Sequence, residues 1–400
     1  MRILFLVFCT ISLAFCEPRA KILSSIPPAK EIYINLETQK CDKDCLLKLY
    51  EDDMLISFLT QFEPNINDDE LKSKYLSLSG QTLLDLDTNK IAVIIPQKII
   101  KSYAKVVQNA LISYILETNA KISLKFIQSD DETTQNIQNA LNIARESGIK
   151  LFITPFTQAG TNVLNSLINK DEIAYIPTIN KATTTNISQN IIFGGVAYDK
   201  QIAYLLLKAG DKISLFVDGS PLGDYLASVV EAMANKNVYQ AKISGKDINI
   251  KEQLSRPDKI NNSAIFLNLP LIKAVLVATQ LKNLEVVPQM LLSTQINFDP
   301  HILTMIEQKD RSELYLANSI SLSSNSLRAT AALFNINLDH NFIAYSNAIG
   351  LEYLYTNFIN NTANKIFKEQ IVSGQVNYDV KIYKTDGYRF VQENSTDKLD

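Results

Sequence analysis

The feature that most constrains the fold is an alternation of short apolar runs and helical segments that begins at Asn89. Residues 90–95 read KIAVII and residues 212–217 read KISLFV, so these runs are almost continuously apolar rather than alternating. Such strands, separated by segments of helical periodicity, are typical of parallel sheets that helices cover on both faces. The sequence therefore predicts an α/β fold.

The alternation falls into two series and a tail. The first series predicts strands at 90–95, 121–128, 151–154, 174–176 and 191–193, with helices at 102–117, up to 147, 161–169 and 199–209. The second predicts strands at 212–217, 238–243, 263–267 and 289–293, with helices at 222–234, 251–254 and 271–281. The tail predicts a helix at 340–357 and a hairpin of 379–383 with 389–391. Two series in succession predict two Rossmann-like lobes, together spanning 89–400.

The first sixteen residues, MRILFLVFCTISLAFC, have the pattern of a secretory signal. Arg2 supplies the positive end, an apolar run follows, and Ala14 and Cys16 are the small residues before a cleavage site at Glu17. The run is short for a membrane span. We therefore expect Sec-type export to the periplasm and removal of 1–16. Lipidation of Cys16 is the alternative, but the bulky Phe15 before it favours a soluble, cleaved product.

Residues 17–88 predict a small helical N-terminal extension, with helices at 45–62 and 68–78. Cys9 and Cys16 lie in the signal, which leaves Cys41 and Cys45 in the sequence CDKDC. In an oxidising compartment such a pair predicts a disulfide. A redox pair and half of a metal site remain as alternatives, although the spacing differs from that of thioredoxin-like motifs.

Composition excludes several classes of function. The formal net charge is −3 and the pI about 5.7, and the basic residues are scattered, which argues against a nucleic-acid surface. After the signal, the best apolar run, LPLIKAVLVATQL, is interrupted by Lys273, so no later membrane span is expected.

Motifs of catalysis and cofactor binding are also scarce. The chain has no phosphate-binding glycine-rich loop, no HExxH and no G-x-S-x-G, and it has only two histidines, His301 and His340. We therefore expect no enzymatic activity, no cofactor and no metal site. An enzyme remains a further hypothesis, for which changing either histidine to Ala would abolish turnover.

Polar residues follow several of the predicted strands, where doubly wound sheets bind their ligands. The candidate ligand-binding residues are Thr157, Gln158, Thr161, Asn180, Thr183, Tyr198 and Asp218. The first three lie in PFTQAGT, whose backbone N–H groups and hydroxyls could hold a carboxylate or amide at a helix N-terminus. The alternative is that these side chains only cap helices and form turns.

The order of elements resembles the type I periplasmic binding-protein fold, as in the branched-chain amino-acid binding proteins. KIAVIIP with the helix after it, LFITPFTQAGT, AYIPTINKATT, FVDGSPLGDYLASVVEAM and FIAYSNAIGLEYLY carry this resemblance. The chain is also similar to the penicillin-binding-protein activator lipoproteins, in which this fold follows a helical domain. One departure is the loop 97–101, QKIIK, which is bulky and lacks the glycine that the small-molecule binders commonly have there.

The resemblance implies a non-enzymatic exported binding protein with a cleft between two lobes. Because of the bulky loop, we expect a cleft that is degenerate for small ligands, with an envelope protein partner such as the cell-wall synthesis machinery. The alternative is a solute receptor of an ABC transporter that binds an amino acid or a similar small polar ligand.

Overall fold

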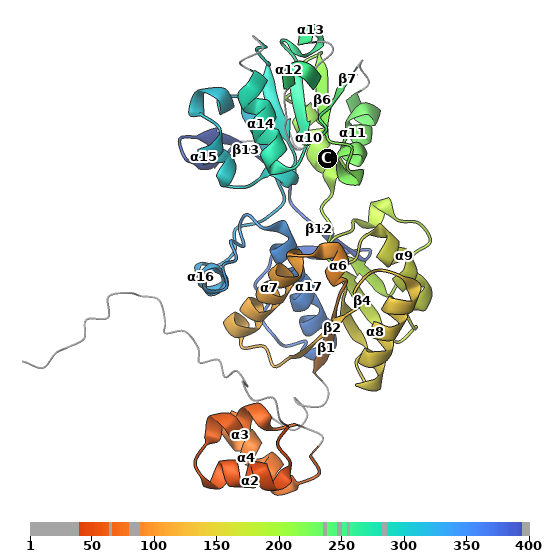
Figure 1. Ribbon diagram of the computed structural model, residues 1–400, viewed down its shortest axis with the longest axis vertical. Helices are drawn as coiled ribbons and strands as arrows, with labels where there is room; N and C mark the ends of the chain where they lie inside the picture. Colours follow the sequence, from red (N-terminus) through yellow and green to blue (C-terminus); the bar gives the residue numbers. More distant parts are fainter. Residues whose placement is uncertain are drawn as a thin grey trace, which may run out of the picture.

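The computed structural model describes residues 40–63, 66–79, 89–234, 238–245, 250–253, 257–281 and 286–393. Two α/β lobes, each built on a seven-stranded sheet, follow a small helical segment (Figure 1). The predicted fold class is confirmed. The predicted signal at 1–16 lies outside the described residues.

The first lobe has the sheet order β11-β12-β5-β4-β3-β1-β2. Its strands are β1 (Lys90–Ile95), β2 (Ser123–Gln128), β3 (Leu151–Ile153), β4 (Ile173–Ile176), β5 (Ile191–Phe193), β11 (Gln370–Val372) and β12 (Gln375–Asn377). Its helical elements are α6 (Gln97–Ile100), α7 (Tyr103–Thr118), α8 (Thr134–Glu146), α9 (Gln158–Leu167), η1 (Lys181–Thr183), α16 (Asn325–Leu333), α17 (Phe342–Leu354) and the π-helix η5 (Tyr355–Ile359). Helices α7, α16 and α17 cover one face of the sheet, and α8 and α9 cover the other.

The second lobe has the sheet order β14-β13-β10-β9-β8-β6-β7. Its strands are β6 (Ile213–Val217), β7 (Val238–Lys242), β8 (Ala264–Asn268), β9 (Met290–Ser293), β10 (Leu314–Asn318), β13 (Lys381–Asp386) and β14 (Arg389–Gln392). Its helical elements are α10 (Tyr198–Leu206), α11 (Pro221–Ala234), α12 (Ile250–Gln253), α13 (Pro257–Ile260), α14 (Leu271–Leu281), η3 (Gln295–Asn297), α15 (His301–Met305) and η4 (Gln308–Arg311). Helices α10 and α11 pack on one face, and α14 and α15 on the other.

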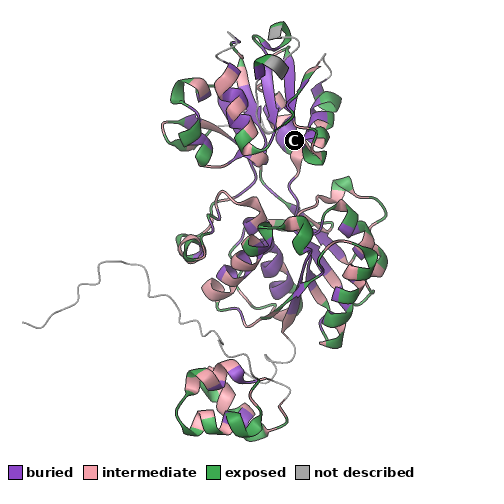
Figure 2. Ribbon diagram, viewed as in Figure 1, coloured by how far each residue is buried: buried purple, intermediate pink, exposed green. Residues whose placement is uncertain are grey.

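Burial on both faces explains the continuous apolar runs. In β1, Ile91 and Val93 point into the core under α7 and α17, whereas Ala92 and Ile94 point into the core under α8. Figure 2 shows buried strands at the centre of each lobe and exposed residues on the outer helices. The strands β1, β3, β4 and β5 pair in parallel, as predicted.

The chain crosses between the lobes three times. It leaves the first sheet after β5 and enters the second lobe at α10, returns from β10 to α16, and crosses again from β12 to β13. The expectation of two series in simple succession is therefore wrong for the last third of the chain. The sequence analysis assigned no element to residues 294–339, where β10 and α16 lie, and it also missed β11 and β12.

The helices before the lobes enclose a small core of their own. Helices α2 (Lys43–Glu51), α3 (Leu55–Gln61) and α4 (Asp69–Ser79) pack around the buried side chains of Leu46, Phe58, Phe62 and Leu71. The predicted Cys41–Cys45 disulfide is present, at the start of α2. One predicted helix at 45–62 is instead two, because Asp53 adopts a left-handed conformation with φ 58°. The turn lets Phe58 pack edge-on against Tyr50, with ring centroids 5.5 Å apart.

None of the helices in the described part of the chain is both long enough and apolar enough to cross a membrane.

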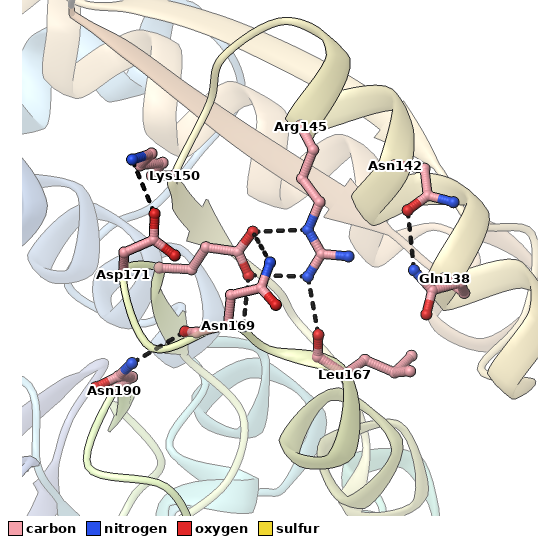
Figure 3. Close-up of polar contacts among 9 residues, drawn as sticks. Gln138, Asn142, Arg145, Lys150, Leu167, Asn169, Asp171 and Asn190 are labelled. Atoms are coloured by element: carbon pink, nitrogen blue, oxygen red, sulfur yellow. Dashed lines mark hydrogen bonds and ion pairs between the residues drawn. The ribbon is translucent and has the colours of Figure 1, made fainter.

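A buried ion pair ties three elements of the first lobe together. Arg145, at the end of α8, donates from Nε to Glu172 Oε1 (2.7 Å) and from Nη2 to Glu172 Oε2 (2.9 Å) and to the Leu167 carbonyl (2.8 Å) (Figure 3). Glu172 also accepts from the backbone N–H of Asn169 at 2.8 Å. These contacts join the ends of α8 and α9 to the start of β4.

Replacing Glu172 should destabilise the first lobe far more than replacing its neighbour. Glu172 is 2% exposed, and Glu172→Gln would leave the Arg145 guanidinium without its charge partner, at an expected loss of about 3 kcal/mol in unfolding free energy. Asp171→Asn breaks an exposed pair with Lys150 and should cost less than about 1 kcal/mol. Urea unfolding of both variants measures this. Equal losses would contradict a structural role for the Arg145–Glu172 pair.

The contribution of Glu172 should also depend on pH. Burial raises the pKa of this carboxyl, but Arg145 and the Asn169 N–H outweigh burial and hold the pKa below its ordinary value of about 4.5. Because the pKa of Glu172 is lower in the folded state than in the unfolded state, its charge stabilises the folded protein above the unfolded-state pKa. This stabilisation is lost as the pH falls through the folded-state pKa. The stability difference between wild type and Glu172→Gln should therefore be largest near neutral pH and shrink as the pH falls below about 4.5. A difference that does not change down to pH 3 would contradict this.

Candidate functional site

The three crossings fix which edges of the two sheets face one another. The chain leaves the first sheet at the carboxyl end of β5, and it leaves the second at the carboxyl end of β10. Since β5 is parallel to β4, β3 and β1, and β10 to β9, β8 and β6, the carboxyl ends of all these strands point towards the opposite lobe. We call the space between these two edges the interlobe region. All seven candidate residues follow strands that end there.

On the first lobe, the N-terminus of α9 is occupied by the protein's own carboxylate. Glu132, in the loop after β2, accepts from the Thr157 backbone N–H at Oε1 (2.6 Å) and from the Gly160 N–H at Oε2 (3.1 Å). The Thr157 hydroxyl also donates to Oε2. The sequence analysis considered a ligand carboxylate or amide at this position and did not single out Glu132.

The remaining first-lobe candidates form a connected turn. The Asn180 amide donates to the Gly195 carbonyl (3.2 Å), and its oxygen accepts from the Ala182 N–H (2.9 Å). The Thr183 hydroxyl donates to the Asn180 carbonyl (2.8 Å) and lies 3.4 Å from Gln158 Oε1. The structure thus brings Gln158, Asn180 and Thr183 together, each with partners of its own. Thr161, one turn into α9, is fully buried, and its hydroxyl has no hydrogen-bond partner.

Residues 97–100 of the loop 97–101 form the short helix α6, directly after β1. Four side chains of the loop, Gln97, Lys98, Ile99 and Lys101, are exposed, and Lys101 ends the helix with φ 49°. Beside it lies a shallow groove of about 630 Å³. Its lining residues are Gln97, Lys101, Ser102, Ala104, Lys105, Gln108, Asn109 and Gln128.

On the second lobe, Asp218 organises the start of α11. Its Oδ1 accepts from the Ser220 hydroxyl (2.6 Å) and backbone N–H (3.1 Å), and Lys273 Nζ lies 3.6 Å from Oδ2. Burial raises the pKa of Asp218, but the Ser220 hydrogen bonds and Lys273 outweigh burial, so the pKa lies below its usual range. This carboxylate is therefore charged at neutral pH.

The candidate Tyr198 is influenced electrostatically by two further tyrosines. Burial raises the pKa of Tyr198, and Tyr225 of α11 and Tyr103 of α7 raise it further. Tyr103 belongs to the first lobe and is 56% exposed, whereas Tyr198 opens α10 in the second lobe. One tyrosine from each lobe therefore contributes to the raised pKa of the candidate Tyr198. Tyr103 and Tyr225 were missed because each lies within a helical pattern.

Two buried polar side chains at the second lobe's strand ends also escaped the sequence analysis. Asn268 ends β8 at 1% exposure, and both its amide oxygen and amide nitrogen lack hydrogen-bond partners. Thr294 follows β9 and is fully buried, and its hydroxyl also lacks a partner. Asp218 was selected as a polar residue that directly follows a predicted strand. The same criterion would have selected Asn268 and Thr294, which also directly follow predicted strands.

Buried hydrogen bonds anchor the crossings on the first lobe. The Tyr378 hydroxyl, in the crossing from β12, donates to the Gly194 carbonyl at 2.6 Å. The Ser346 hydroxyl of α17 lies 2.9 Å from the same carbonyl and 3.0 Å from that of Pro177. A Cβ on Gly194 would lie 1.9 Å from the Tyr175 hydroxyl, so this close approach requires glycine.

A second buried network anchors them on the other lobe. The Gln201 side chain of α10 accepts from the Gln295 N–H (2.8 Å) and donates to the Ser319 hydroxyl (2.7 Å). The Ser319 N–H in turn donates to Gln295 Oε1 at 2.6 Å. The crossings at 194–197 and 319–324 therefore share one anchor.

The two histidines have separate surroundings. His301 is exposed and pairs with Asp299 through Nδ1 at 2.6 Å. From the sequence, we expect His340 at the surface or as a helix cap. Instead its ring stacks on Phe298, with centroids 5.2 Å apart, and lies 5.6 Å from Phe390, and burial lowers its pKa. Within the described ranges, no three His, Cys, Asp or Glu side chains are grouped so as to hold a metal ion.

Comparison with known proteins identifies the architecture. A branched-chain amino acid ABC transporter protein from Thermus thermophilus with bound valine superposes with a TM-score of 0.57 at 14% identity, covering 76% of this chain and 94% of that one. A periplasmic ligand-binding protein of such a transporter from Burkholderia xenovorans gives 0.56 at 14%, with the same coverage. A substrate-binding protein from Streptococcus pneumoniae in complex with isoleucine gives 0.53 at 13%, covering 76% and 100%.

The fold is that of the type I periplasmic binding proteins. The resemblance inferred from the sequence is thereby confirmed at the level of the fold, since identities this low support the fold alone. No protein-family model and no curated protein sequence matches the chain.

Removing the shared anchor should destabilise the hinge of this periplasmic-binding-protein fold. Gln201→Ala would leave the Gln295 N–H and the Ser319 hydroxyl buried without partners, and we expect a loss of about 2 to 3 kcal/mol in unfolding free energy. The matched control is Gln240→Ala on the exposed surface of β7, with an expected change within about 0.5 kcal/mol. Equal losses in the two variants would show that the anchor is unimportant.

Proposed function

We propose that this protein is an exported solute receptor that closes its two lobes over a small polar ligand, as the binding component of a transporter. The observation that carries the proposal is the pair of sheet edges that face one another across the interlobe region, both lined with polar side chains. The neighbouring structures support it, since they are branched-chain amino acid transporter proteins, two of them holding valine or isoleucine.

The mechanism follows from the three crossings. Each crossing is short and anchored at one end or both, so the lobes can rotate about 194–197, 319–324 and 378–380 with little change inside either lobe. A ligand that contacts both edges favours the closed arrangement by its differential affinity for it. This motion requires no reactive side chain, only contacts between the ligand and both edges.

The second lobe supplies the hydrogen-bonding groups that we assign to ligand recognition. A buried amide or hydroxyl without a partner costs about 1 to 3 kcal/mol, so Asn268 and Thr294 leave hydrogen-bonding capacity that a ligand can satisfy. Asp218 adds a negative charge partly offset by Lys273. Tyr198 adds an aromatic surface with a polar tip, suited to a ligand with both apolar and polar parts. Thr157, Gln158, Thr161, Asn180 and Thr183 form the facing wall in this proposal.

Export and partner choice remain predictions. A leader at 1–16 accounts for delivery to the periplasm, where the comparable binding proteins act. Recognition of an envelope protein partner also stays a prediction, and the neighbouring structures favour a small ligand over it.

A ligand screen by thermal unfolding tests the proposal. A ligand present at a hundred times its dissociation constant adds about 2.7 kcal/mol to the stability of the folded state. We expect one class among amino acids, amines, amides, peptides and sugars to raise the melting temperature of the wild-type protein. Asn268→Ala should abolish most of that shift, whereas Gln240→Ala on β7 should preserve it.

Two results would contradict the proposal. If no class of compound raises the melting temperature, the solute-receptor hypothesis is excluded and recognition of a protein partner becomes the favoured hypothesis. A shift that Asn268→Ala and Gln240→Ala reduce equally would place the ligand outside the interlobe region.

A further inference from the structure

The carboxylate of Glu132 accepts from two backbone N–H groups and one hydroxyl at the start of α9. A helix begins with backbone N–H groups that have no partner within the helix, and these groups attract anions. Here Thr157 and Gly160 donate such N–H groups to the two carboxylate oxygens at 2.6 Å and 3.1 Å, and the Thr157 hydroxyl adds a third donor. Glu132 comes from the loop after β2, so the contact is between two separate strand-end loops.

The local packing is fitted to this carboxylate. A Cβ on Gly160 would lie 2.6 Å from Cδ of Glu132 and 2.9 Å from its Cγ, so only glycine lets the side chain lie against the helix. The next residue, Thr161, keeps a fully buried hydroxyl without a partner. The first turn of α9 therefore binds the Glu132 carboxylate and also contains the buried Thr161 hydroxyl, which has no hydrogen-bond partner.

The loop that carries Glu132 is itself held on both sides. The Lys98 N–H donates to the Asp130 carbonyl (2.7 Å), and Lys98 Nζ lies 3.1 Å from Asp130 Oδ2. Asp131 accepts from the Thr133 hydroxyl (2.7 Å) and from the Asn136 amide (2.6 Å). Glu132 is thus positioned before any ligand arrives, and holding it there requires no further ordering.

We infer that Glu132 is a built-in occupant of the anion-binding start of α9 and that it excludes a ligand carboxylate from the first lobe. This inference rests on the proposed function, because a solute receptor is what would bring a ligand to this edge. It narrows the ligand to a small polar compound that presents a neutral or cationic group to α9. The sequence indicated that a ligand carboxylate or amide could bind at this helix, and in this inference a carboxylate of the chain itself takes that place.

Chemical rescue by acetate tests the inference without knowledge of the natural ligand. In Glu132→Ala the start of α9 loses its anion, and we expect the melting temperature to fall by about 2 °C. Sodium acetate should restore it, because acetate replaces the missing carboxylate, whereas sodium chloride at the same ionic strength should not. Wild type should show no difference between the two salts.

Two variants serve as controls. Glu132→Gln keeps the side chain in place without its charge, so acetate has no room to bind and should give no rescue. Glu146→Ala removes an exposed acidic residue at the end of α8 and should respond to neither salt beyond wild type. Rescue confined to Glu132→Ala supports the inference.

Three results would overturn it. These are a Glu132→Ala protein as stable as wild type, acetate no better than chloride, or acetate stabilising wild type to the same extent. The outcome is independent of the ligand screen. If acetate rescues Glu132→Ala but no compound in the screen binds, the solute-receptor function is excluded and the role of Glu132 at α9 stands. If a compound binds but acetate gives no rescue, the solute-receptor function stands and the role of Glu132 is excluded.

Discussion

The two lobes depend on three short crossings whose ends are fixed by buried hydrogen bonds. Gly194 accepts from Tyr378 and Ser346 at the first lobe, and Gln201 joins Gln295 to Ser319 at the second. Buried polar groups are costly unless they are paired, so these contacts hold each crossing at a defined place. The same crossings turn the carboxyl ends of both sheets towards each other, which places every candidate residue in the interlobe region.

The two facing edges differ in how their polar groups are satisfied. On the first lobe Glu132 fills the start of α9, and Gln158, Asn180 and Thr183 bond within the lobe. On the second lobe Asn268 and Thr294 are buried without partners. The first lobe also keeps buried hydroxyls without partners, at Ser129, Thr154 and Thr161. Both edges therefore retain hydrogen-bonding capacity, while the start of α9 on the first lobe is filled by a carboxylate of the chain itself.

Local pattern explains which parts could be predicted from the sequence. The strand at 90–95 and the helix at 271–281 were predicted with the bounds that the structure has, because continuous apolar runs and punctuation such as Pro96 are local signals. β10 was missed because its five residues, LYLAN, are too short a run to indicate a strand by themselves. They form a strand by pairing with β9 and β13. The return of α16 and α17 to the first lobe, and the reach of Glu132 to α9, depend on contacts between distant residues that no local pattern records.

Lobe closure is the central claim, and an interlobe distance tests it most directly. Spin labels on Glu146→Cys in α8 and Glu231→Cys in α11 lie on opposite lobes, and Cys41 and Cys45 are protected in their disulfide. Electron–electron double resonance should show the distance distribution shift to shorter values when the stabilising ligand is added. A distribution that stays the same at saturating ligand would contradict closure and, with it, the account given for the three crossings.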